Sequence, residues 1–309
     1  MPEGSGPSAW RPRLAANFSV RHPPFLAGFS ASDHSCTVPS CLGKCSAVIL
    51  AALFQAAACA RTPVAEPPHP ASGVPVLRLL SYNINYGIPG DADTVAAIRE
   101  AKADLALLQE TNAAWERALR AQLALEFPHM VFRHRGGAGG LGVLSRRPLL
   151  DIDFLAPAAG GGWFPAARMV VETSFGRVQV LSVHLRPAVS DSGSLVGGHF
   201  STPEIRTSEI TSFYARLVPD LPTLIAGDFN EEEDGSAVRF LVDKGMESAL
   251  RRYAPTQPTW RWPTVVGTLH RQLDHIFYDA RLEVLSAEVR EAGSSDHLPV
   301  IAVVTAAKR

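Results

Sequence analysis

One short stretch of the sequence joins an apolar run to two side chains that could do chemistry. The run from Thr223 to Ala226 is followed by Gly227, and Asp228 and Asn230 come next, two positions apart. Side chains repeat every two residues along a strand, so both groups would leave the end of a buried strand in one direction. Open α/β sheets bind ligands at that end. A carboxylate and a carboxamide aimed together suit a hard metal ion and a phosphate oxygen, but an Asx turn explains them equally well.

Similar polar side chains close other apolar segments of the chain. Asn83 and Asn85 follow an apolar segment that begins at Val76, and Glu110 closes the next one. Taken singly, each has an ordinary explanation, such as a hydrogen-bonded core histidine for His184. Burying all of them without a ligand or an ion would be costly. The whole set consists of Asn83, Asn85, Glu110, His184, Asp228, Asn230, Asp274, His275, Asp296 and His297.

The hydrophobic pattern predicts the elements that would position these residues. Strands at 76–86 and 104–110 alternate with helices at 91–103 and 113–126, which indicates α/β organisation. A hairpin through Phe175-Gly176 is expected between two later strands. The other strands are expected at 140–145, 149–155, 168–173, 177–185, 272–278, 282–290 and 298–304, and further helices at 202–217 and 236–244.

Most of the polar residues fall in five short motifs that follow one another along the chain. The motifs are Tyr82-Asn83-Ile84, Leu108-Gln109-Glu110, Ser182-Val183-His184-Leu185, Gly227-Asp228-Phe229-Asn230 and Ser295-Asp296-His297-Leu298-Pro299-Val300. In this order they make the chain resemble the endonuclease/exonuclease/phosphatase superfamily, which includes deoxyribonuclease I-like and exonuclease III-like enzymes. The resemblance spans nearly all of residues 76–304.

The resemblance implies a fold and a reaction. The fold would be α/β, a four-layer sandwich of two packed mixed β-sheets flanked by helices, formed by residues 74–309 as one domain. The reaction would be hydrolysis of a phosphoester with a divalent metal, Mg²⁺ or alternatively Mn²⁺. The substrate would be a nucleic acid, or a lipid-linked or small organic phosphate, and the protein would be a monomer. The alternative is a non-catalytic binding domain on the same fold.

The resemblance also assigns roles around the metal. Glu110 would be the principal metal ligand, with Asn83 assisting from the same side and Asp296 as a further ligand. Asp228 and Asn230 would position the attacking water and a phosphate oxygen. Such an oxygen-rich set suits Mg²⁺, which retains several of its waters.

The remaining roles concern proton transfer and substrate contacts. By the same resemblance, His297 would act as base or as a donor to the transition state, oriented by Asp274. His184 would stabilise the transition state or assist the leaving group. Asn85 and Arg168 would bind the substrate, with Arg168 as a phosphate contact.

Several other residues leave alternatives open. His275 is either an extra substrate contact or a strand residue on the other face, and the second reading is favoured. Trp260 and Trp262 either hold a base or a lipid headgroup through their ring faces, or pack beneath the late strands. Arg206 and Glu209 open a predicted helix and could face the site.

The composition sets limits on function. The chain has 309 residues, of which 46% are hydrophobic and 19% charged, and its formal net charge is -1. No polybasic segment is present, so bulk electrostatic attraction to nucleic acid is not indicated. All four cysteines lie within the first 59 residues, so the chain from residue 60 on has no thiol nucleophile and no disulfide.

The N-terminal segment predicts export. Residues 1–43 read as a disordered leader, and Lys44 then precedes an apolar run over 47–58 that ends at Cys59. This pattern favours a bacterial lipoprotein, with a signal peptide without lipid or a disordered tail as alternatives. Residues 60–73 form a Pro-rich linker. We therefore expect an extracytoplasmic protein, either secreted or held in the cell envelope by an N-terminal lipid anchor.

Overall fold

The computed structural model of the chain describes residues 73–188 and 202–308. The predictions of a leader and a signal segment within residues 1–59 lie outside the described residues, as does nearly all of the predicted linker. The described part contains no helix that is both long enough and apolar enough to span a membrane.

Two six-stranded mixed sheets form the centre of the fold. In each sheet one pair of strands is parallel, β1 with β2 and β7 with β8. The first sheet has the order β13 (Leu282–Val289), β14 (Val300–Ala306), β1 (Leu77–Asn83), β2 (Leu105–Gln109), β4 (Leu141–Ser145) and β3 (His129–Arg133). The second has the order β5 (Leu149–Leu155), β6 (Ala166–Thr173), β7 (Gly176–His184), β8 (Thr223–Asp228), β12 (Asp274–Tyr278) and β9 (Glu247–Ser248).

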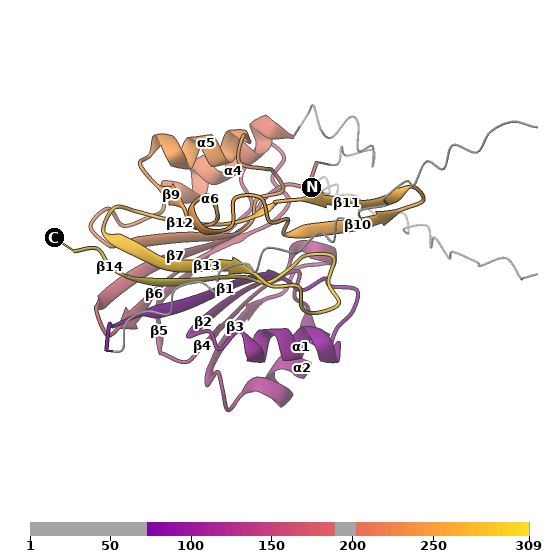
Figure 1. Cartoon of the computed structure of the whole chain (residues 1–309), viewed down its shortest axis with the longest axis horizontal. Coiled ribbons are helices and arrows are strands. Elements are labelled where there is room, and N and C mark those ends of the chain that lie inside the picture. Colours follow the sequence, from indigo (N-terminus) through magenta and orange to yellow (C-terminus); the bar gives the residue numbers. More distant parts are fainter. Residues whose placement is uncertain (1–72, 189–201, 309) are drawn as a thin grey trace, which may run out of the picture. The chain divides into compact units, whose positions relative to one another are not determined.

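Helices cover the outer face of each sheet, as Figure 1 shows. Helices α1 (Ala92–Glu100) and α2 (Ala113–Leu123) pack on the first sheet, and α4 (Pro203–Tyr214) and α5 (Ser236–Asp243) on the second. The shorter elements are the 3₁₀ turn η1 (Gly137–Gly139) and the helix α6 (Ala249–Tyr253). The predicted four-layer α/β sandwich is therefore confirmed.

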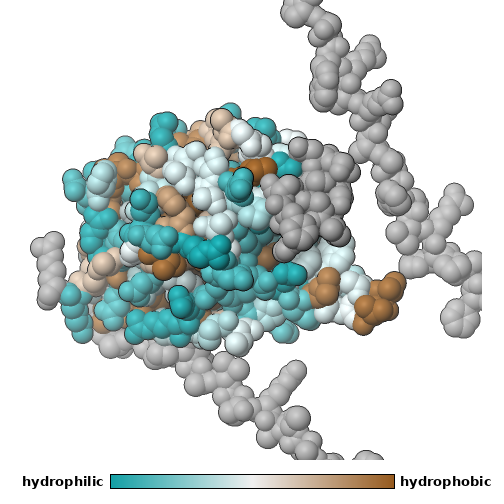
Figure 2. Space-filling view, turned by 90° about the horizontal axis from the view of Figure 1, so that it is seen from above, coloured by the Kyte–Doolittle hydropathy of each residue, from teal (hydrophilic) through white to brown (hydrophobic). Residues whose placement is uncertain are grey.

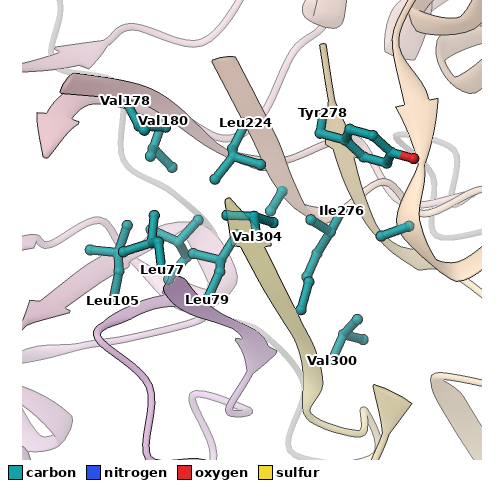
Figure 3. Packing of buried hydrophobic residues seen from close by; sticks show 14 of the residues in the cluster. Leu77, Leu79, Leu105, Val178, Val180, Leu224, Ile276, Tyr278, Val300 and Val304 are labelled. Carbon is teal, nitrogen blue, oxygen red and sulfur yellow. The ribbon is translucent and has the colours of Figure 1, made fainter. Parts of the chain in front are cut away.

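The two sheets pack through an apolar layer, part of which is drawn in Figure 3. Leu77 and Leu79 of β1 face Leu224 of β8 and Val178 and Val180 of β7 across this layer. Residues two apart on a strand share a face, so the alternate residues of these strands pack outward against the helices. Leu80 and Tyr82 do so beneath α1 and α2.

The same inward face changes from apolar to polar at one edge of the sandwich. On β1, the inward-facing residues are Leu77, Leu79, Ser81 and finally Asn83. On β8, they are Leu224, Ala226 and finally Asp228. By the same two-residue repeat, His184 is the last inward-facing residue of β7, and Asp274 is the first inward-facing residue of β12. Strand periodicity therefore delivers four site residues to one edge.

The predicted boundaries hold for most elements and fail in identifiable places. The strand expected through Tyr86 ends at Asn83, because Asn85 has a φ of +57° and leaves the extended region. Asp91 caps α1, and its side chain accepts from the Thr94 backbone N–H. A two-stranded ribbon of β10 (Trp260–Thr264) and β11 (Gly267–Arg271) was not predicted.

Candidate active site

Three strand ends at this edge carry a strained backbone. Asn85, Glu110 and Asn230 have φ values of +57°, +60° and +53°, in the left-handed region that non-glycine residues rarely adopt. Such residues cost of order 1–3 kcal/mol each and collect at functional sites. Within the described residues only Lys102 and Asp151 share this conformation. The strain therefore marks the edge where the predicted residues converge.

Asn83 connects two carboxylates that come from different sheets. Its Nδ2 donates to Oε1 of Glu110 and to Oδ2 of Asp228, each at 3.1 Å. Its Oδ1 accepts from the Asn85 backbone N–H at 3.2 Å, which fixes the orientation of the carboxamide. In this arrangement the amide nitrogen, and not the oxygen, faces Glu110. Asn83 thus orients Glu110, and its predicted metal contact stays a prediction.

Asp228 also lies between two histidines. Nε2 of His184 and Nε2 of His297 are each 3.5 Å from Oδ2 of Asp228. On its other side, His297 places Nδ1 2.8 Å from Oδ2 of Asp274. The predicted orientation of His297 by Asp274 is present in this geometry.

The charges around the two buried histidines give them different protonation states. Burial lowers the pKa of His297, but the charges of Asp274 and Asp228 outweigh it and raise the pKa to about 10. Burial lowers the pKa of His184 to about 4, although Asp228 opposes the shift. At neutral pH His297 is therefore an imidazolium and His184 a neutral imidazole, so the two rings have different proton-transfer roles.

Asp296 is held at the mouth of the site by two donors. Nδ2 of Asn85 lies 3.3 Å from its Oδ1, and Nε1 of Trp260 lies 3.1 Å from its Oδ2. Ser295 locks the same turn, because its Oγ donates to the Asn83 carbonyl oxygen at 2.7 Å and accepts from the His297 N–H. The turn that carries Asp296 and His297 is thereby tied to the end of β1.

Glu110 and Asp296 form a donor set that fits a hard divalent cation. Burial raises the pKa of Glu110 and the charge of Asp296 raises it further, while bonds from Asn83 and the Tyr86 N–H oppose the shift. Two carboxylates that repel each other gain from a cation between them. Each carboxylate oxygen has two lone pairs, so the observed hydrogen bonds leave room for a metal ligand bond. Carboxylate oxygens are the ligands that Mg²⁺ prefers.

A second acidic group includes a histidine. One ligand atom each from Asp228, Asp274 and His297 lie within 4.8 Å of one another. His297 has its pKa raised to about 10, so its imidazolium offers no lone pair to a metal at neutral pH. This trio therefore fits proton donation better than metal binding, and the metal fits Glu110 and Asp296 better.

A cleft of about 790 Å³ is lined by Asp228 and His297 of this trio and by Glu110 and Asp296. Two aromatic side chains without a predicted catalytic role contact the candidate site residues His184 and Asp296. Phe164 stacks on His184 with ring centroids 4.1 Å apart, and Trp260 reaches Asp296. The lining includes Glu110, Phe164, His184, Arg206, Asp228, Asn230, Arg239, Trp260, Arg271, Asp296 and His297. The sequence signal for Phe164 was an aromatic pair beside the Gly160–Gly162 turn, next to a predicted strand.

One predicted site residue, Arg168, does not point into the cleft, and a second, Asn230, lines the cleft but donates from its side chain to the backbone. Arg168 pairs with Leu181 on the face of β6 opposite to Ala167 and Met169, which belong to the inter-sheet core. Its Nη2 lies 3.4 Å from the Asp151 carbonyl oxygen, so the predicted phosphate contact is wrong for this geometry. Asn230 donates from Nδ2 to the Leu185 carbonyl oxygen at 3.0 Å, which holds the strand end rather than a ligand.

The open alternatives are resolved by position. His275 is fully buried on the outward face, where a ring nitrogen lies 2.9 Å from the Glu231 carbonyl oxygen, so the favoured reading is confirmed. Arg206 does line the cleft, and its Nε donates to Glu231 at 2.8 Å. Glu209 is buried and accepts from the Arg186 N–H.

The two tryptophans also have a definite place. Trp260 and Trp262 stack with centroids 6.1 Å apart, and Trp262 is 51% exposed. They lie on the β10–β11 ribbon, so the alternative of packing beneath the late strands is wrong.

A comparison with known families matches this chain over residues 80–297 to the model described as Endonuclease/Exonuclease/phosphatase family. The matched range includes every residue of the cluster, from Asn83 to His297. No curated protein matches the chain.

Similar solved structures support the fold. An endonuclease/exonuclease/phosphatase from Beutenbergia cavernae has a TM-score of 0.60 and 20% identity, over 75% of this chain and 72% of that one. The human Nocturnin catalytic domain with bound sulfate has a TM-score of 0.57 and 16% identity, over 75% and 95%. TDP2 from D. rerio, complexed with a single-strand DNA product, has a TM-score of 0.58 and 15% identity, over 74% and 99%.

Proposed function

Since the chain belongs to the Endonuclease/Exonuclease/phosphatase family, we propose that it is a divalent-metal-dependent hydrolase of phosphoester bonds. The observation that carries this proposal is the buried array Asp274–His297–Asp228 beside the carboxylates of Glu110 and Asp296. An imidazolium, a carboxylate and a candidate cation site within one cleft can each act on a different part of a phosphate.

The imidazolium of His297 donates a hydrogen bond from Nε2 to a phosphate oxygen as negative charge develops there. Asp274 keeps the proton on this ring by accepting from Nδ1 at 2.8 Å. Asp274 lies beneath the cleft, and its hydrogen bond to His297 also fixes the plane of the imidazole ring. His297 is therefore proposed as the transition-state donor rather than the base.

Asp228 accepts the proton of the attacking water. Burial raises the pKa of Asp228, against the opposing charge of His297, which makes it a better base than an exposed aspartate. Asn83 and the backbone N–H of Asn230 hold its two oxygens. His184, neutral and stacked on Phe164, lies beside Asp228 and is placed to assist the leaving group.

A divalent cation held by Glu110 and Asp296 would draw electron density from the phosphate and offset its charge. Mg²⁺ is the proposed cofactor, with Mn²⁺ as a substitute. The sulfate and the DNA product in the similar structures are both phosphate-like ligands, and they support a phosphoester as the substrate. Nucleic acid and lipid-linked or small organic phosphates both remain within this proposal.

The test is turnover of a generic phosphodiester, bis(p-nitrophenyl) phosphate, together with plasmid DNA, RNA and phospholipid. EDTA should abolish hydrolysis and Mg²⁺ or Mn²⁺ should restore it. His297→Ala and Asp228→Ala should each lower kcat by about 10²-fold or more with an unchanged thermal midpoint. Activity that is indifferent to metal would overturn the mechanism. Hydrolysis of none of these substrates would favour a non-catalytic binding domain.

We further propose, from the sequence pattern alone, that the protein is exported as a monomer and anchored through Cys59. The variant Cys59→Ser should then move the protein from the membrane fraction to the soluble fraction. An unchanged distribution between these fractions would remove the lipoprotein proposal and leave secretion without lipid.

A further inference from the structure

Four exposed apolar side chains gather on the β10–β11 ribbon. Val265 and Val266 form its turn and are 102% and 93% exposed. Farther along the ribbon, Trp262 and Leu269 pair across the strands and are 51% and 54% exposed. Figure 1 shows the ribbon projecting from the sandwich, and Figure 2 shows hydrophobic colour at its outer end. Exposed apolar groups that gather on one element indicate an interaction surface.

The side chains of the ribbon change in character from its tip to its base. Behind the Val265-Val266 tip come two pairs without a charged group, Thr264 with Gly267 and Pro263 with Thr268. The pair Trp262 and Leu269 follows, and then the pair Arg261 and His270. The whole ribbon, residues 260–271, contains no Asp or Glu. This order of apolar tip, indole belt and cationic base matches the depth profile of a lipid surface, where tryptophan prefers the interface and arginine meets anionic headgroups.

The base of the ribbon belongs to the cleft itself. Trp260 pairs with Arg271, and both line the cleft, where Trp260 also bonds Asp296. A strand rises about 3.4 Å per residue, so the tip lies roughly 17 Å beyond Trp260. A surface bound by the tip would therefore lie within reach of the site.

We propose that the β10–β11 ribbon docks the protein on a phospholipid bilayer, with Val265 and Val266 inserted into the apolar boundary of one leaflet. Trp262 and Leu269 lie at the level of the headgroups. Arg261, whose Nη2 donates to the Gly293 carbonyl oxygen at 3.4 Å, lies behind them near the base of the ribbon. This docking does not depend on the N-terminal segment. If the proposed function holds as well, the docked cleft faces phosphoesters of lipid headgroups, and this last step alone rests on the proposed function.

A lipid surface explains the ribbon better than a nucleic acid does. Val265 and Val266 offer neither a stacking ring nor a donor to a polyanion. The inserted valines instead gain free energy by leaving water.

The test is co-sedimentation of the full chain carrying Cys59→Ser with vesicles of phosphatidylcholine, with and without phosphatidylglycerol. The double variant Val265→Ser, Val266→Ser should partition about tenfold more weakly or worse, since burial of valine is worth more than 1.4 kcal/mol. Leu125→Ser is the matched control, because Leu125 is 98% exposed and follows α2, away from the ribbon. It should bind like the parent, and all three proteins share the same N-terminal segment.

The assay measures binding without turnover, so its failure is distinguishable from failure of the proposed function. Circular dichroism and the thermal midpoint confirm that the variants fold. The proposal is overturned if the parent does not sediment with vesicles, or if Leu125→Ser loses as much binding as the ribbon variant. The proposal is also overturned if the ribbon variant keeps vesicle binding but no longer binds a single-stranded oligonucleotide. The same holds if the variant keeps vesicle binding but no longer self-associates.

Discussion

Asn83 and Asp228 are 145 positions apart in the chain, and the Nδ2 of the first lies 3.1 Å from the Oδ2 of the second. Asn83 ends β1 of one sheet and Asp228 ends β8 of the other. The bond therefore forms only when the two sheets are packed. Through Asn83 it links the carboxylate of Glu110 to the histidine side of the site. The chemistry of the cleft depends on the inter-sheet core that holds this edge in register.

We expect Asp274→Asn to lower kcat/KM by about 10²- to 10⁴-fold and to change its pH dependence. Asp274 is a main cause of the pKa of about 10 at His297. If the imidazolium is the donor, activity falls as the pH rises through that pKa. Without the Asp274 charge the pKa drops, so the alkaline limb of the pH profile should move to lower pH by at least one unit. The exposed Asp220→Asn is the matched control, and an unmoved alkaline limb would contradict the donor role of His297.

Gly227→Ala should destabilise the fold much more than Gly176→Ala. Both glycines have positive φ, +152° and +120°. A Cβ at Gly227 would lie 1.9 Å from the Val183 carbonyl oxygen, whereas a Cβ at Gly176 would meet nothing within 4 Å. We expect a loss of about 1 kcal/mol for Gly176→Ala and of about 3 kcal/mol or more for Gly227→Ala, because backbone must move. Urea unfolding of both variants measures the difference, and equal losses would refute the steric argument.

The sequence was sufficient for the residues that lie on strand ends. Asn83, His184, Asp228 and Asp274 continue the inward apolar series of their strands, so period-two alternation alone predicts that they share a face and an edge. The resemblance of the motifs to the family then predicted a phosphoester site at this edge. The side chain orientations of Asn83 and Asn230 could not be predicted, because they depend on hydrogen bonds to Asn85 and Leu185.

The sequence failed where the outcome depends on register or on exposure. Arg168 is one residue away from the inward positions of β6, and a shift of one residue reverses the face of a strand side chain. The β10–β11 ribbon could not be predicted because its apolar residues are exposed, whereas a hydrophobic pattern indicates a strand only where apolar residues are buried. The contact of Trp260 with Asp296 spans 36 positions and has no local signal.

Glu209→Gln should change how the stability of the protein depends on pH. Burial raises the pKa of Glu209 from 4.5 to about 7, so its protonated form is favoured by folding. The stability that this group contributes is fully present below pH 4.5 and is lost as the pH rises through 7. The unfolding free energy of Glu209→Gln minus that of the parent should therefore rise by about 1.4 kcal/mol per pH unit across this window. Buried His184 has the opposite dependence, but it is common to both proteins and cancels. Urea titrations at several pH values in EDTA measure the slope, and a flat difference would contradict the raised pKa.

Trp260→Phe should weaken metal binding without removing the aromatic wall of the cleft. The indole Nε1 donates to Oδ2 of Asp296 at 3.1 Å, and phenylalanine keeps the ring but loses this donor. Groups that orient a metal ligand typically affect metal affinity by about 10- to 100-fold. We therefore expect the Mg²⁺ concentration for half-maximal activity to rise by about that factor. Asp296→Asn provides the control, because Trp260→Phe in that background should add almost nothing if the indole acts through Asp296. A full additional loss in the double variant would mean that Trp260 contacts the substrate instead, and its role would then be binding rather than positioning of the metal ligand.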